Sequence, residues 1–268
     1  MHLRLPINPA SEVADRILHD LKRDGIVIFP ISQVASGDKL LDALYCEWTS
    51  LDKNSAAEID ERRRHALSGD SAKGKPYLYE YPTRCAATSP HWQFAIHPDI
   101  LYVVNSYMNA YARVYDVTYL VNFPMRDKSA IRSQVWHRDG DGTVLKLFVY
   151  LSDVTEETGP FVYAAGTHCS PLREVSYGKT RPQTDDELRA LLGGYDRDFI
   201  SAVGKKGTVV LTNTSGIHKG GHVLEGERRV LRISYYPSWI DRSDYGLKVP
   251  KDFGDDLHPA QQHALSRS

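Results

Sequence analysis

The sequence predicts an α+β protein with a mainly β core, in which helices come first and short strands follow. Amphipathic helical patterns occupy much of the first 115 residues. From residue 118 onward, short apolar stretches are each bounded by Gly, Pro, Asp or Ser. This order favours a sandwich or barrel core with helices outside it. We find no internal repeat or low-complexity linker, so we expect one domain over 1–268, with a helical part at about 1–115, a barrel core at about 116–240 and a polar tail at 241–268.

The helical part begins with an amphipathic pattern at residues 11–24, which Gly25 should end. A short buried strand, "IVIFP", is expected at residues 26–30. Further helices are predicted at 37–51 and 98–114.

A charged segment at residues 52–75 is expected to form an exposed helix followed by a mobile loop. After it, Tyr77, Tyr79 and Tyr81 alternate along an extended stretch and share one side. This aromatic face is either part of the core or a substrate-binding wall.

Short strands dominate the second half of the chain. One helix interrupts them at 184–192, where Thr184 and Glu187 form a capping box and Gly193 marks the end. The predicted strands lie within the segments "TYLVNFPM", "SQVWHRD", "TVLKLFVYLSDV", "PFVYAAG", "GTVVLTNT" and "RVLRISYYP".

Composition narrows the possible partners and the cellular setting. A net charge of −1 over 268 residues argues against a broadly basic nucleic-acid binder. Three widely spaced cysteines do not suggest a disulfide framework, which favours a reduced, cytoplasmic protein. No stretch approaches the roughly 20 apolar residues of a membrane span, and the first residues lack an export signal. The oligomeric state is left open.

The chemistry centres on the segment "SQVWHRDGDG" at residues 133–142. His137 and Asp139 are two residues apart, so on an extended strand both side chains point to the same side. Gly140 and Gly142 allow the backbone to turn tightly directly afterwards. An imidazole and a carboxylate on one face at a strand end are two thirds of a metal site.

The third ligand is expected from the end of another strand. His218 follows the apolar strand "TVVLTNT" and precedes a Gly-rich turn. A second His-x-Asp, His97-Pro98-Asp99, is better interpreted as a helix start, because proline and aspartate suit the first turn. His168 lies in a glycine-led turn, where a hydrogen-bonded loop histidine is expected.

Two histidines and one carboxylate form the facial triad of non-heme Fe(II) enzymes, with three coordination positions open. Zinc uses the same ligand types, so the ligands alone do not select the metal. Arg228 stands ten residues after His218, far enough for one hairpin return towards the metal strand. A guanidinium there suits a bidentate carboxylate, and the combination fits a chelating keto acid.

At this point the chain resembles the phytanoyl-CoA dioxygenase family of Fe(II)/2-oxoglutarate oxygenases. The matching pieces span roughly 120–237 and are "QVWHRDGDG", "LKLFVYLSDVTEETGPFVYAAGTHCSP", "TSGIHKGG" and "GERRVLRISYY". The resemblance implies a double-stranded β-helix, which is a jelly-roll, cupin-like barrel. It also implies Fe(II) held by His137, Asp139 and His218, with 2-oxoglutarate and O2 as cosubstrates.

The resemblance further implies that Arg228 binds the distal carboxylate of 2-oxoglutarate. The family arginine more often stands eleven residues after the last histidine, which would select Arg229, whereas the Gly-x-Arg pattern and the spacing to Tyr235 select Arg228. Because neighbours on a strand face opposite ways, only one of the two can serve. Asn122 is expected to contact the keto acid.

For substrate binding, we expect Tyr79 and Phe148 to contribute, and Lys146 shares a strand face with Phe148. No catalytic residue beyond the metal ligands is predicted. The implied activity is oxidation of a small-molecule metabolite or natural-product intermediate by hydroxylation, desaturation or ring formation, with release of succinate and CO2. Halogenation is disfavoured, because related halogenases have a small residue where this chain has Asp139.

Three rival interpretations remain. A nucleic-acid demethylase of the same superfamily would place its arginine further from the last histidine and does not suit the charge. A non-redox cupin-like metal hydrolase or isomerase would use the same three ligands but would leave Arg228 unexplained. A non-catalytic binding module would predict a broken triad.

Overall fold

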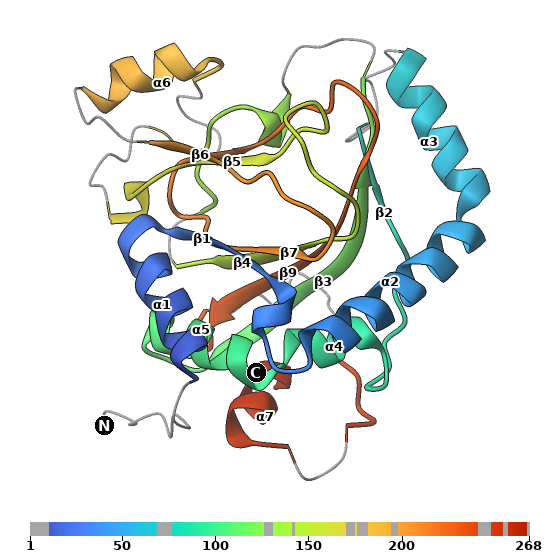
Figure 1. The fold of residues 1–268 in the computed structure, drawn as a ribbon, viewed down its shortest axis with the longest axis vertical. Coiled ribbons are helices and arrows are strands. Elements are labelled where there is room, and N and C mark those ends of the chain that lie inside the picture. Colours follow the sequence, from blue (N-terminus) through green and yellow to red (C-terminus); the bar gives the residue numbers. More distant parts are fainter. Residues whose placement is uncertain are drawn as a thin grey trace.

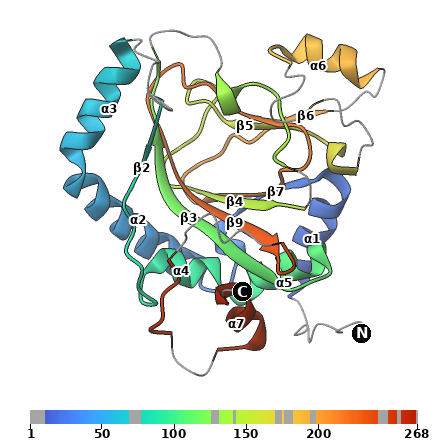
Figure 2. The same ribbon diagram turned by 180° about the vertical axis from the view of Figure 1, so that it is seen from behind.

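The core of the protein consists of two antiparallel sheets with helices packed on the outside of the larger one (Figures 1 and 2). The computed structural model describes residues 11–68, 77–125, 131–140, 143–169, 175, 182–193, 198–240, 248–253 and 257–266. The larger sheet has the strand order β1-β7-β4-β9-β3-β2, and the smaller has the order β6-β5-β8. The predicted fold class, a β core with helices outside, is confirmed.

The described strands are β1 (Ile26–Pro30), β2 (Leu78–Glu80), β3 (Ala112–Asn122), β4 (Leu145–Tyr150), β5 (Phe161–Ala164), β6 (Phe199–Ser201), β7 (Thr208–Asn213), β8 (His218–Gly220) and β9 (Arg228–Pro237). The described α-helices are α1 (Glu12–Asp24), α2 (Gly37–Asn54), α3 (Ala56–Ser68), α4 (Pro90–Ala95), α5 (Pro98–Met108), α6 (Asp185–Leu192) and α7 (Pro259–Leu265). Short 3-10 turns lie at Ile31–Gln33, Arg132–Gln134 and Thr167–Cys169.

Alternation along the strands gives the larger sheet two different faces. On β9, Leu231, Ile233 and Tyr235 pack into the core shared with the helices. The intervening residues on β9 point to the other face, where Arg228 and Arg232 line a cavity. Because side chains on a strand alternate between faces, one sequence pattern builds both the core and the cavity wall.

Capping residues fix both ends of the first helix, α1. The Ser11 side chain accepts a hydrogen bond from the backbone N–H of Ala14, and Gly25 takes a left-handed conformation with φ of 80°. A Cβ on Gly25 would lie 2.4 Å from both His168 Nδ1 and Tyr163 Oη. Glycine is therefore required here both by its backbone angle and by the close approach of two side chains.

The predicted helix at 98–114 is too long. Helix α5 ends at Met108, Asn109 adopts a left-handed φ of 51°, and β3 begins at Ala112. Asparagine tolerates this conformation better than most residues, so it ends the helix as glycine does elsewhere. The predicted border near residue 115 therefore lies within a strand.

The segment 133–139 also differs from the predicted strand. It begins in a 3-10 turn, and His137 makes only a single antiparallel bridge, with His218. The loop predicted at the end of the segment 52–75 lies mostly outside the described residues.

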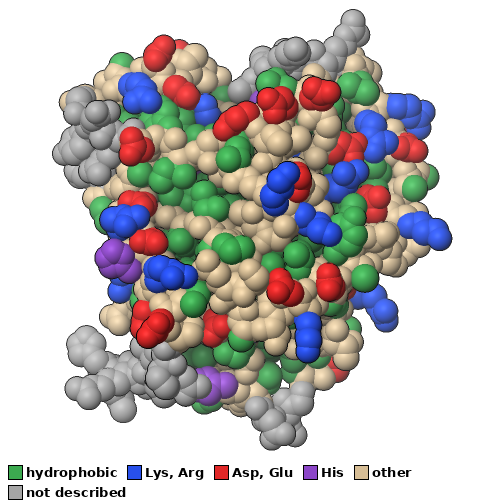
Figure 3. Space-filling model, viewed as in Figure 1, with side chains coloured by type: hydrophobic (Ala, Val, Ile, Leu, Met, Phe, Trp, Pro, Cys, Tyr) green, Lys and Arg blue, Asp and Glu red, His purple; other side chains and the backbone are tan. Residues whose placement is uncertain are grey.

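The polar tail folds back onto the helical layer. Gln261 Nε2 donates to the carbonyl of Ile96 at 3.1 Å, and the His263 ring stacks on Tyr111 at a centroid distance of 4.2 Å. Figure 1 shows α7 beside α4 and α5. On the face shown in Figure 3, acidic and basic side chains are interspersed. None of the described helices is long and apolar enough to cross a membrane.

Candidate metal centre

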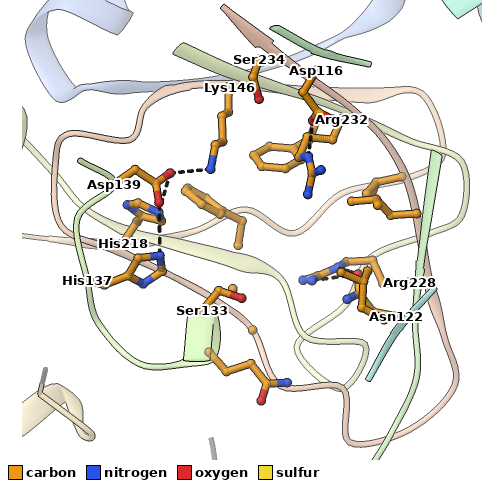
Figure 4. A pocket seen from close by; sticks show the side chains of 18 of the residues that line it. Asp116, Asn122, Ser133, His137, Asp139, Lys146, His218, Arg228, Arg232 and Ser234 are labelled. Carbon is orange, nitrogen blue, oxygen red and sulfur yellow. Dashed lines mark hydrogen bonds and ion pairs between the residues drawn. The ribbon is translucent and has the colours of Figure 1, made fainter. Parts of the chain in front are cut away.

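A cavity of about 580 Å³ lies between the two sheets. Its lining comes from the inner faces of β3, β4 and β9 of the larger sheet, from β5 and β8 of the smaller one, and from the segment 133–140. Figure 4 shows the polar side chains that converge on it. The volume falls within the range of small-molecule sites.

The three predicted metal ligands meet at this cavity. One ligand atom from each of His137, Asp139 and His218 lies within 4.8 Å of the others, and no other such cluster occurs among the described residues. Asp139 Oδ1 lies 3.7 Å from His137 Nε2, and Asp139 Oδ2 lies 3.8 Å from His218 Nε2. The spacing in the sequence thus brings two imidazoles and one carboxylate together.

Backbone pairing sets the positions of these ligands. The backbone N–H groups of His137 and His218 each donate to the other's carbonyl at 2.9 Å. The backbone N–H of Asp139 donates to the carbonyl of Thr214, also at 2.9 Å. The segment therefore presents the ligands through three hydrogen bonds although it is not a regular strand.

Both imidazoles are oriented for coordination by their Nε2 atoms. His137 Nδ1 donates to the carbonyl of Val135 at 2.8 Å, and His218 Nδ1 donates to the carbonyl of Gly216 at 2.9 Å. A carbonyl oxygen can only accept, so each Nδ1 carries a proton, and in the neutral ring the lone pair is then on Nε2. A hydrogen bond from the other ring nitrogen to a backbone carbonyl is typical of histidines that bind metal.

The electrostatics suit a cation. Burial, followed by the proximity of His137, lowers the pKa of His218 to about 3, so this ring is neutral near pH 7. Burial alone would raise the pKa of Asp139, but the charge of Lys146, followed by the proximity of the two histidines, outweighs burial and holds that pKa far below its usual value. Two imidazoles and a carboxylate are the donor set of the non-heme iron facial triad, so the residues fit that metal.

Arg228 lies at another wall of the same cavity. Its Nε and Nη2 donate to Asn122 Oδ1 at 3.4 and 3.2 Å, and β9 pairs Arg228 directly with Asn122 on β3. Among the described residues it makes no ion pair. Burial lowers the pKa of Arg228, which reflects a guanidinium held without a carboxylate.

Arg229 faces the other way. Its Nη2 donates to Glu227 Oε2 at 2.7 Å, and its guanidinium lies 5.3 Å from the centre of the Trp48 ring. It does not line the cavity. Of the two arginines that the sequence left open, the structure brings only Arg228 to the metal ligands' cavity.

The structure brings one of the two expected substrate-binding residues to this cavity. Phe148 lines the cavity, whereas Tyr79 does not. Tyr79 pairs with Val121, and both pack on the side of the helices, while the adjacent Leu78 faces the cavity. Strand alternation places Tyr79 on the core face, next to Tyr81 at a ring-centroid distance of 5.1 Å, so the structure does not bring it to this cavity.

One charged pair in the cavity was missed from the sequence. Arg232 Nε donates to Asp116 Oδ2 at 2.5 Å, and both side chains line the cavity. The signal was present on β9, because Arg228 and Arg232 are four residues apart and therefore share a face. The partner on β3 is set by a register shift near Val114, which the sequence does not reveal.

The other histidine predictions are confirmed. His97 caps α5, where its Nδ1 accepts from the backbone N–H of Asp99 at 3.2 Å. His168 Nε2 donates to the carbonyl of Lys22 at 3.2 Å. Neither belongs to the cluster of metal ligands.

A facial triad of two histidines and a carboxylate, set between antiparallel sheets, defines the class of non-heme iron enzymes. The family comparison agrees: residues 120–230 match the model of the phytanoyl-CoA dioxygenase (PhyH) family. The resemblance read from the sequence is thereby confirmed, and the matched range contains all three ligands and Arg228. No curated protein matches the chain significantly.

Several solved structures share the fold over nearly their whole length. SnoK, a non-heme alpha ketoglutarate dependent carbocyclase from nogalamycin biosynthesis, is 17% identical, with 92% of this chain and 98% of that chain covered and a TM-score of 0.55. The epimerase SnoN from the same biosynthesis is 17% identical over 91% and 92%, with a TM-score of 0.51. HygX from Streptomyces hygroscopicus, with nickel and 2-oxoglutarate bound, is 18% identical over 87% and 89%, with a TM-score of 0.54. At such identities the likeness establishes the fold.

Proposed function

We propose that the protein is an Fe(II)- and 2-oxoglutarate-dependent oxygenase that hydroxylates, desaturates or cyclises a small-molecule metabolite or natural-product intermediate. His137, Asp139 and His218 hold the metal. The products from the cosubstrate are succinate and CO2. A zinc hydrolase or isomerase that uses the same three ligands is the alternative.

One observation carries the proposal. Arg228 shares a cavity with the three ligands and has no carboxylate partner among the described residues. A partly buried guanidinium without an anion is unfavourable, and a bound carboxylate would satisfy it. A dicarboxylate whose keto acid end binds the metal would place its other end there. A simple metal hydrolase gives this arginine no role.

The second cavity arginine is a poorer candidate for that carboxylate. Arg232 is already paired with Asp116 at 2.5 Å, and its Nη2 also lies 3.5 Å from Glu80 Oε1. An incoming carboxylate would have to compete with these acidic groups. Arg228 has only the neutral amide of Asn122, which orients the guanidinium without neutralising it.

In this proposal, Fe(II) with 2-oxoglutarate and O2 supplies the oxidising chemistry when bound. The protein's own residues bind and orient the reactants. The three ligands would hold the metal, Arg228 and Asn122 would fix the cosubstrate, and Phe148 provides apolar surface that limits water. Asp116 and Arg232 offer polar contacts to a substrate on the remaining wall.

A small-molecule substrate is supported by the size of the cavity and by the structural neighbours. SnoN has been crystallised with Fe3+, alpha ketoglutarate and nogalamycin RO, and HygX with nickel, 2-oxoglutarate and hygromycin B. A cavity of about 580 Å³ suits a cosubstrate together with part of such a molecule.

Anaerobic titration with Fe(II) and 2-oxoglutarate tests the proposal. We expect a weak visible metal-to-ligand charge-transfer band in the parent protein and none in His137→Ala, because that variant lacks one ligand. His97→Ala is the matched control, since it changes the other His-x-Asp sequence and should keep the band. Absence of the band in the parent, together with tight zinc binding, would instead support the hydrolase or isomerase.

A further inference from the structure

Lys146 is an unexpected neighbour for a site that binds a cation. It lies on β4, and its Nζ forms an ion pair with Asp139 Oδ2 (Figure 4). The side chains are only 25% and 20% exposed. A positive charge next to a metal ligand opposes metal binding by simple Coulomb repulsion. Its presence there suggests a specific role in the site.

The neighbouring groups leave Asp139 as the ion-pair partner of Lys146. The other carboxylate on this wall, Asp116, accepts hydrogen bonds from Arg232 Nε and from Thr118 Oγ1 at 2.5 and 2.8 Å. Across the described residues, the only ion pair of Lys146 is the one with Asp139. The register of β4 and β9 places Lys146 opposite Ser234, which is uncharged.

The two carboxylate oxygens of Asp139 therefore have different partners. Oδ1 and Oδ2 lie at similar distances from a histidine, 3.7 Å from His137 Nε2 and 3.8 Å from His218 Nε2 respectively, but only Oδ2 also accepts a charge-assisted hydrogen bond from Lys146. We propose that Lys146 is a positioning residue that holds Oδ2, so that Asp139 offers the metal a single oxygen. This inference rests on the proposed function for the presence of a metal at the triad.

Two consequences follow from this arrangement. A carboxylate that used both oxygens would occupy one of the positions that the keto acid and O2 require. The ammonium also draws electron density from the carboxylate, which makes Asp139 a weaker donor to the metal. Lys146 thus keeps the site open at the expense of some metal affinity.

Co(II) alone is the probe that tests this role, because its visible absorption reports coordination number without any turnover. We expect Lys146→Met to change the Co(II) spectrum before 2-oxoglutarate is added. We also expect the affinity of the Co(II) form for 2-oxoglutarate, measured by calorimetry, to fall about tenfold. Lys146→Arg keeps the positive charge and the hydrogen-bond donors, so it should largely restore the parent Co(II) spectrum and the parent affinity for 2-oxoglutarate.

Lys205→Met is the matched control. It removes an exposed lysine whose ion pair with Asp153 has an Nζ–Oδ2 distance of 2.8 Å, and that pair does not line the cavity. Its Co(II) spectrum should equal that of the parent. Circular dichroism verifies folding, and Lys146→Gln replaces Lys146→Met if the latter does not fold.

Two results would overturn the inference. One is a Lys146→Met spectrum and affinity identical to those of the parent. The other is a spectrum that differs only after 2-oxoglutarate is added, which would mean that Lys146 binds the keto acid and not Asp139. A parent that binds no Co(II) at all would overturn the proposed metal site itself, and this outcome is distinguishable from both.

Discussion

Two neighbouring arginines begin β9, and their surroundings are opposite. Arg228 points into the cavity towards Asn122, and Arg229 points out towards Glu227 and Trp48. The difference is a consequence of strand alternation, in which a shift of one residue exchanges the two faces. A choice between adjacent residues is therefore also a test of the strand register.

Arg228→Ala is expected to raise the concentration of 2-oxoglutarate needed for half-saturation by more than tenfold, because a charge-assisted bidentate contact is lost. Binding of Fe(II) alone should be unchanged. The measurement is a 2-oxoglutarate titration of the charge-transfer band.

Arg229→Ala is the matched control and should alter that requirement little, since its partner is Glu227 outside the cavity. The reverse order of effects would show that Arg229, and not Arg228, serves the cosubstrate.

At the residue scale, the sequence was most informative where ligand spacing was short. His137 and Asp139 are two residues apart, so their proximity needed only an extended backbone. His218 required a second strand end, which the apolar run before it supplied. Asp116 was not predictable, because its meeting with Arg232 depends on pairing between distant strands with a register shift.

At the scale of elements, β3 and β9 form the longest pairing of the larger sheet and carry the Asp116–Arg232 pair on its cavity face. Burial would raise the pKa of Asp116, but the charge and hydrogen bonds of Arg232 outweigh this and lower it. A carboxyl whose pKa is lower in the folded state stabilises the fold above its unfolded pKa. That contribution is lost as the pH falls through the folded value.

Arg232→Met should therefore destabilise the protein by about 2–3 kcal/mol near pH 7, since it leaves a partly buried carboxylate without its partner. The loss should shrink as the pH falls towards about 3, because protonation of Asp116 then removes the unpaired charge. Urea unfolding of the parent and the variant at several pH values measures this loss of stability. Adding Asp116→Asn to Arg232→Met should recover stability at pH 7, and a pH-independent loss would show that packing is responsible.

Element boundaries were less predictable than element types. Thr184 caps α6, because its hydroxyl accepts a hydrogen bond from the backbone N–H of Glu187 at 3.1 Å, as the capping pattern indicated. The Glu187 side chain, however, accepts from the backbone N–H of Gln183 through Oε2. In contrast, the run of apolar residues after Met108 hid the change from helix to strand. Asn109 was the only local signal, and asparagine is a weaker terminator than glycine.

At the scale of the whole molecule, the tail is part of the core on the side of the helices. Ala264 is 1% exposed, and several other apolar tail residues pack against the main cluster: Val249, Phe253, Leu257, Ala260 and Leu265. No described tail residue lines the cavity. These contacts hold the described part of the tail against the helical layer and away from the cavity.

Ending the chain at Ile240 should consequently lower stability and spare the metal site. Losing the buried apolar area of α7 and its flanking residues is expected to cost roughly 3 kcal/mol, which corresponds to a fall of about 10 °C in Tm for a chain of this size. Ala264→Asp should reproduce most of that fall without a deletion, because a charge there cannot remain packed against α5 and β3. Below the lowered Tm, the Fe(II)–2-oxoglutarate band should persist in both variants. Loss of the band with an unchanged Tm would place the tail in the active site after all.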